Sequence, residues 1–144
     1  MRKTFLSLLV FACMRADAGA ADAFDCAADG ARLQQLRIYE INRKTRDPFH
    51  ERFRDHALRI MKKHGFNVID LWESDTGEKL QLIYVLDWPD KDTMESAWKA
   101  FLADAEWIEI KKRSAERHGQ LVHEAKGQSL ERLAYSPACR ADAK

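Results

Sequence analysis

The sequence predicts an α+β domain in which strands and helices follow the order β-α-β-β-α-β, the ferredoxin-like arrangement. Two strand-like runs, 36–41 and 82–88, are each followed by a segment whose apolar residues recur at helical spacing. A turn cluster at 74–77 separates two further strand-like segments and indicates a hairpin. The chain has 144 residues, 46% of them hydrophobic, which suits one domain with a buried core.

The first strand is expected over 33–41. Alternate positions carry Leu36 and Ile38 in one set, and Tyr39 and Ile41 in the other. Because both sets contain apolar or aromatic side chains, the pattern predicts a central strand that is covered on both faces.

The first helix follows at once. Pro48 suits a first helical turn, with Asp47 as its cap, and Gly65 suits a left-handed residue just after the helix. Between them the apolar positions recur at helical spacing, and they are Phe49, Phe53, Ala57, Ile60 and Met61.

The second half repeats strand and helix. Segments 67–73 and 79–88 form the expected hairpin, and Asp92 or Thr93 opens a second helix, which is expected to break near Asp104 and to end at His118 and Gly119. Leu130, Leu133 and Tyr135 place the last strand at 128–135, before Pro137.

Residues 1–20 have the layout of a secretory signal peptide. A basic start is followed by an apolar run at 5–14 and by small residues at 16–20 that suit cleavage. The run is too short to span a bilayer as a helix. We expect export to a periplasm or outside the cell. The alternatives are a lipoprotein anchored at Cys13, whose lipobox bulky Phe11 fits poorly, and a cytosolic protein with an apolar N-terminus.

Charge and cysteine content constrain the partners. The formal charge is +1, and losing Arg2, Lys3, Arg15 and Asp17 with the signal would leave −1, which excludes a focused positive field for nucleic acid. Cys26 and Cys139 would remain. In the predicted topology the first and last strands are antiparallel neighbours, so a disulfide could join the two ends and contribute roughly 4 to 5 kcal/mol. Two unpaired thiols are the alternative.

No catalytic or metal-binding motif stands out. The cysteines form no C-x-x-C, and the histidines form no H-x-x-x-H; they are His50, His56, His64, His118 and His123. We therefore expect no metal and no cofactor.

Aromatic residues are dense for so small a domain. Such rings could line a pocket for a flat apolar molecule, or they could form only the core. The candidate pocket residues are Arg37, Tyr39, Trp72, Tyr84, Trp98 and Trp107.

Several of these segments together resemble the NIPSNAP family. They are Leu36-Arg37-Ile38-Tyr39, His64-Gly65, Leu71-Trp72, Trp88-Pro89-Asp90, Ala97-Trp98-Lys99-Ala100-Phe101 and Asp104-Ala105-Glu106-Trp107. The resemblance implies a dimeric α+β barrel, in which a second copy covers the sheet face that the helices leave open.

The predicted organisation is a signal at 1–20, an extension at 21–31, a NIPSNAP-like domain at 32–137 and a tail at 138–144. The expected function is non-catalytic binding of a small apolar ligand or a protein partner by a homodimer without a transmembrane helix. The alternative is a cofactor-independent monooxygenase or isomerase acting on a small aromatic or dicarbonyl substrate, with Tyr or His as the base.

Overall fold

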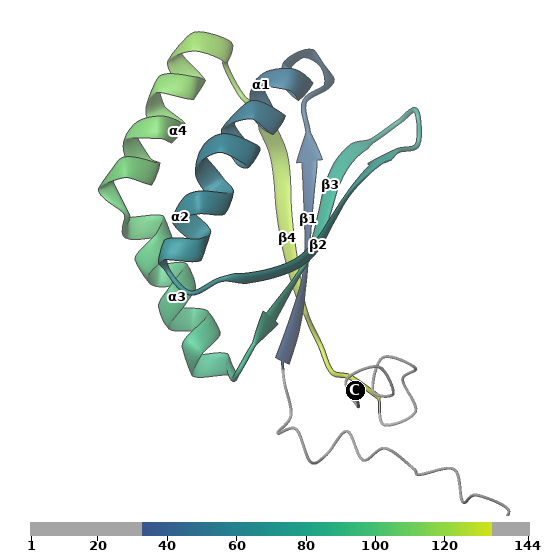
Figure 1. Cartoon of the computed structure of the whole chain (residues 1–144). Coiled ribbons are helices and arrows are strands. Elements are labelled where there is room, and N and C mark those ends of the chain that lie inside the picture. Colours follow the sequence, from purple (N-terminus) through teal and green to yellow (C-terminus); the bar gives the residue numbers. More distant parts are fainter. Residues whose placement is uncertain (1–32, 134–144) are drawn as a thin grey trace, which may run out of the picture.

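A four-stranded antiparallel sheet forms one layer of the protein, and helices cover one of its faces (Figure 1). The computed structural model describes residues 33–133. The strands lie in the order β2-β3-β1-β4. Their bounds are Leu33–Ile41 for β1, Asn67–Asp75 for β2, Leu80–Trp88 for β3 and Val122–Leu130 for β4.

The helical layer contains two long segments. The first runs without a break through α1 (Arg46–Arg52), a π-helical turn η2 (Phe53–Ala57) and α2 (Leu58–Lys63), after a short 3-10 turn η1 (Arg43–Thr45). The second contains α3 (Lys91–Ala103) and α4 (Ala105–His118), which meet at Asp104. The element order confirms the predicted ferredoxin-like α+β fold.

The expected break at Asp104 is confirmed, and its cause is a cap. The Asp104 carboxylate accepts hydrogen bonds from the backbone N–H groups of Glu106 and Trp107, at 3.0 and 3.1 Å, and so starts α4. Gly65, with φ of 81°, follows the end of α2 in the left-handed region, as predicted, and Gly119, with φ of 73°, follows the end of α4, where the second helix was expected to end.

The predicted last strand, 128–135, was wrong. β4 spans Val122–Leu130 and pairs with β1, with Gln34 opposite Leu130 and Ile41 opposite Val122. It is an edge strand whose side chains are mostly exposed and polar, so it lacks the apolar alternation that marks a covered strand.

Two predicted helix starts also need correction. The first helix begins at Arg46, so Asp47 lies inside it and does not cap it. The second begins at Lys91, where the Asp90 side chain accepts a hydrogen bond from the Thr93 backbone N–H at 2.7 Å. Pro48 does lie in the first turn, as expected.

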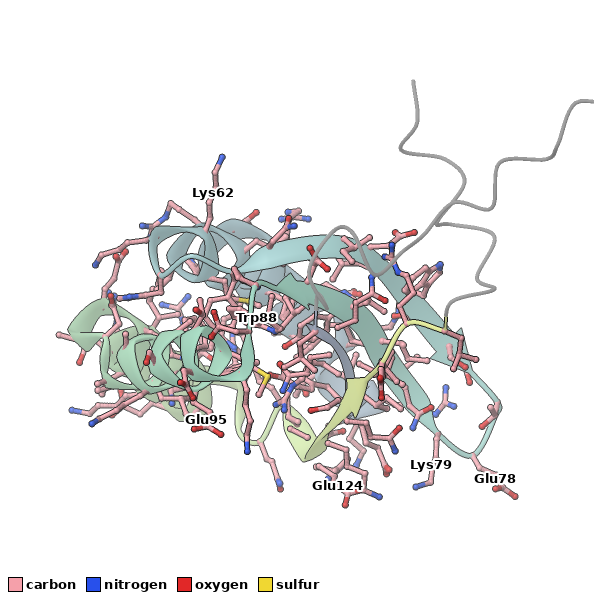
Figure 2. The ribbon with its side chains drawn as sticks, turned by 90° about the horizontal axis from the view of Figure 1, so that it is seen from below. Lys62, Glu78, Lys79, Trp88, Glu95 and Glu124 are labelled. Atoms are coloured by element: carbon pink, nitrogen blue, oxygen red, sulfur yellow. The ribbon has the colours of Figure 1, made fainter. Side chains whose placement is uncertain are left out.

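The core lies between the sheet and the helices. Along β3 the side chains of Tyr84, Leu86 and Trp88 are completely buried beneath the helical layer. Figure 2 shows Trp88 in this interior, whereas the labelled charged residues, such as Lys62 and Glu124, point outward. Phe49 and Ile60 contribute from the helices.

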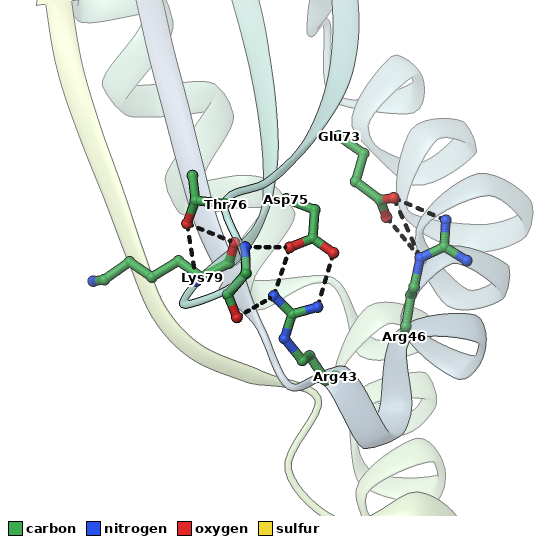
Figure 3. A network of polar contacts seen from close by, with 7 residues as sticks. Arg43, Arg46, Glu73, Asp75, Thr76 and Lys79 are labelled. Atoms are coloured by element: carbon green, nitrogen blue, oxygen red, sulfur yellow. Dashed lines mark hydrogen bonds and ion pairs between the residues drawn. The ribbon is translucent and has the colours of Figure 1, made fainter.

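Ion pairs fasten the start of the first helix to the β2–β3 hairpin (Figure 3). Arg43 donates to both carboxylate oxygens of Asp75, at 2.8 and 2.6 Å, and to the Gly77 carbonyl at 2.9 Å. Arg46 binds Glu73, with Nη2 at 2.8 Å from Oε1. The Arg43 guanidinium and the Gly77 backbone N–H hold the pKa of Asp75 well below its usual range.

Candidate functional site

The six predicted pocket residues lie on both faces of the sheet. Trp72 lies on the face without helices, and its side chain is 48% exposed. The other five lie between the sheet and the helical layer, and they are Arg37, Tyr39, Tyr84, Trp98 and Trp107. The structure therefore brings together most of the set, but not Trp72.

Two tyrosines form a polar pair beneath the helices. The Tyr84 hydroxyl donates to the Tyr39 hydroxyl at 3.0 Å, and Arg37 Nη2 approaches the same oxygen at 3.5 Å. Burial, with the neighbouring Tyr39, raises the pKa of the Tyr84 phenol. This phenol stays protonated at neutral pH, so it is poorly suited to act as a general base.

Arg37 lies between a ring and a strand. Its guanidinium carbon is 4.5 Å from the centroid of the Trp98 ring, and Trp98 is held in place by a 2.8 Å hydrogen bond from its Nε1 to Gln35. On the other side β4 offers Gly127, which is opposite Arg37 in the register. A Cβ atom at this position would overlap the guanidinium, so Arg37 fits because residue 127 is glycine.

Trp107 belongs to an aromatic chain in the core. Its ring lies 5.1 Å from that of Phe101, and the Arg52 guanidinium is 5.6 Å from its centroid. Phe66, Trp98 and Phe101 continue the chain toward Trp88. These contacts account for Trp98 and Trp107 as packing residues.

The other sheet face carries a continuous band of apolar side chains. Because neighbouring residues of a strand point to opposite faces, the buried set of β3 leaves Ile83 and Val85 on this side. In the register Ile83 lies between Trp72 on β2 and Ile38 on β1. We call this surface the open-face strip, and its residues are Leu36, Ile38, Trp72, Ile83 and Val85.

A groove between the two helical segments was missed by the sequence reasoning. It has a volume of about 230 Å³ and runs between α1 with η2 on one side and α4 on the other. None of the six predicted residues lines it. The available signal in the sequence was basic residues four positions apart, Arg52 with His56 and Arg113 with Arg117. Such spacing is also typical of a solvated helix face.

Within residues 33–133, no helix is long and apolar enough to cross a membrane, and no group of three or more His, Cys, Asp or Glu side chains is placed to hold a metal ion. The signal peptide, Cys13 and the proposed Cys26 to Cys139 disulfide lie outside this described part of the chain.

A protein-family model described as NIPSNAP matches residues 34–137. The chain belongs to the NIPSNAP family. Solved structures agree with this assignment. An uncharacterized NIPSNAP-like domain protein from Burkholderia xenovorans is 18% identical, with a TM-score of 0.64 over 75% of this chain and 90% of that one. A NIPSNAP family protein from Agrobacterium tumefaciens is 19% identical, with a TM-score of 0.64 over 74% of this chain and 97% of that one.

The fold also occurs outside this family. A putative antibiotic biosynthesis monooxygenase from Nitrosomonas europaea is 13% identical, with a TM-score of 0.50 over 72% of this chain and 92% of that one. At such identity the likeness shows the fold alone. No curated protein sequence matches the chain.

Proposed function

We propose that this NIPSNAP protein is a homodimeric binding protein whose two copies pair through the open-face strip. The observation that carries the proposal is the exposure of Trp72, at 48%, within an apolar band that continues over three strands. Contiguous exposed apolar surface of this kind marks interaction sites in soluble proteins.

The chemistry of the strip suits a second copy of the same chain. A two-fold interface brings each surface against itself, so unpaired charge at its margin would repel. Two pairs of charges at the margin are neutralised within the chain, Lys79 with Glu40 at 2.8 Å and Lys126 with Glu124 at 3.0 Å, whereas Asp70, opposite Val85 in the register, forms no ion pair with a described residue. The centre is apolar and the rim is polar, as in stable interfaces.

Binding accounts for the structure better than catalysis does. A monooxygenase or isomerase without a cofactor needs a general base in its deprotonated form. The Tyr84 phenol is buried and its pKa is raised, which disfavours that form. The Tyr39 hydroxyl beside it accepts hydrogen bonds from Tyr84 and Arg37 within the fold. The proposal includes export with a signal at 1–20 and a Cys26 to Cys139 disulfide, and its bound partner is a small molecule or another protein.

Replacing Trp72 tests the dimer. Trp72→Glu places a charge within the strip, and we expect the dissociation constant of the dimer to rise at least tenfold, because a buried unpaired carboxylate opposes association. Sedimentation equilibrium of the mature protein over a range of concentrations measures this constant.

Leu102→Glu is the matched control. Leu102 is also an exposed apolar side chain, at 53%, but it lies on α3 in the helical layer. It should leave the dimer intact. A wild-type protein that stays monomeric at high micromolar concentration, or a Leu102→Glu variant that dissociates as readily as Trp72→Glu, would refute the proposed interface.

A further inference from the structure

The groove between α1 with η2 and α4 concentrates cations from two helices. Arg52 and His56 line it from the first helix, and Arg113, Arg117 and His118 line it from the second. Its volume of about 230 Å³ is below the range of roughly 300 to 1,000 Å³ of drug-sized pockets, so it suits a small ligand.

Arg52 is the most informative of these groups. Its Nη1 donates to the Ser114 hydroxyl at 2.9 Å, and its guanidinium lies near the Trp107 ring. It is partly buried, and burial lowers its pKa, with Tyr39 acting in the opposite sense. No carboxylate in residues 33–133 forms an ion pair with it, and a sheltered cation without a counter-charge is costly. An anion in the groove would supply that charge.

The other groove cations are also largely available. Arg117 makes no ion pair with a described residue, and Arg113 has only a 3.5 Å contact with Glu109 one turn away. Glu51 is the one carboxylate of the lining. Three arginines against one glutamate leave an excess positive charge even when both histidines are neutral.

The helix on one side of the groove is locally distorted. In η2 the Leu58 backbone N–H donates to the Phe53 carbonyl, five residues back, which is the hydrogen bond of a π turn. This turn contains His56, which lines the groove. Single π turns occur frequently at functional sites, so this distortion is an independent indication at the same place.

We propose that this groove is a binding site for a small phosphorylated molecule. Arginine forks recognise phosphate oxygens with paired hydrogen bonds, and donors from two facing helices can surround a tetrahedral group, whereas a planar carboxylate uses one fork. The site deepens the proposed binding function by naming a ligand class, and it lies on the helical layer, away from the open-face strip.

Calorimetric titration with inorganic pyrophosphate tests the site. The mature protein is titrated at constant ionic strength, with citrate as the carboxylate comparison. We expect saturable binding of one pyrophosphate per chain. Arg52→Gln should weaken it about tenfold or more, and Arg117→Gln several-fold, because each removes a charged donor.

Arg54→Gln is the matched control, because Arg54 lies in the same π turn, is exposed, pairs with Asp55 and does not line the groove. It should leave pyrophosphate affinity unchanged. Trp72→Glu should also retain one site per chain, which separates failure of the dimer from failure of the groove.

Three results would overturn the site: no saturable pyrophosphate binding, an equal loss in Arg54→Gln, or tighter binding of citrate. If circular dichroism shows that Arg52→Gln does not fold, the test uses Arg117→Gln, because Arg117 is exposed. An unchanged pyrophosphate affinity in Arg117→Gln then counts against the site.

Discussion

The two faces of the sheet carry similar residues, yet only one of them is covered by the chain. On β3, Leu82, Tyr84 and Leu86 point toward the helices and are at most 5% exposed. Their neighbours Ile83 and Val85 are as apolar, but they point to the other side and remain only partly buried. A strand that is apolar on both faces is typical of a sheet with two covers. This difference between the two faces supports the second copy that we propose as the other cover.

The faces also differ in how they hold polar groups. The covered face contains Arg37, Tyr39 and Tyr84, which contact one another or aromatic rings. The open face has its charges at the margin, among them Asp70 on the edge strand β2 and the pairs Glu40 with Lys79 and Glu124 with Lys126. The polar groups of the covered face stabilise the core, whereas the open face has an apolar centre that suits association.

Neighbouring substitutions on β3 give the sharpest test and the largest effect. Leu82→Ala should lower the free energy of unfolding by about 2 to 5 kcal/mol, because it opens a cavity under the helices. Ile83→Ala should lower the free energy of unfolding less in dilute solution, and this loss should grow with protein concentration. Urea denaturation at two widely spaced concentrations measures both. Equal losses of unfolding free energy in the two variants, with no dependence on protein concentration, would contradict the proposed difference between the two faces.

Gly127→Ala tests the covered face with a smaller effect. The added Cβ displaces the Arg37 guanidinium from its place over Trp98, and the loss of this contact should cost about 1 kcal/mol. The cost should vanish in an Arg37→Leu background, which a double-mutant cycle by chemical denaturation would show. A similar cost in both backgrounds would mean that Gly127 matters for the strand alone.

Acid should destabilise the helical layer at Asp104, and this is the smallest of the three expected effects. Lys63, His64 and the Trp107 backbone N–H hold the pKa of Asp104 well below its ordinary value of 3.8. A depressed folded-state pKa gives stability that is present above about pH 4 and is lost as the pH falls below it. Thermal unfolding should therefore show that Asp104→Asn lowers the melting temperature at pH 7 and lowers it less at pH 3. Glu106 and Arg59 are the other charged groups nearby.

Asp92→Asn serves as the control for this pH series, since Asp92 is an exposed first-turn acid of α3. A penalty for Asp104→Asn that is the same at both pH values would exclude the carboxylate as the source of the effect.

Strong local signals made much of the fold predictable. β1 was placed at its observed bounds because its apolar alternation is dense, and the break at Asp104 followed from a capping side chain that acts within three residues. β4 was misplaced because its stability comes from pairing with β1 and not from buried side chains of its own. Pairing across more than eighty residues leaves little trace in a local pattern.

The site was less predictable for the same reason. Tyr39 and Tyr84 were both chosen as candidate pocket residues, but their hydrogen bond depends on the pairing of β1 with β3. Trp72 was grouped with them, although the alternation of its strand sends it to the other face. The groove depends on which sides of two helices meet, and neither helix shows this alone.

The π turn has a consequence for the length of the chain. Each residue of an α-helix advances the side chains by about 100°, and a π turn holds one residue more between its bonded groups than an α turn. Deleting one residue from Phe53–Ala57 would therefore remove the π turn and restore a regular helix, while the residues after it keep their faces, so Lys63 and His64 would still reach Asp104. In this helix a gap of one position in an alignment would mark the loss of the π turn.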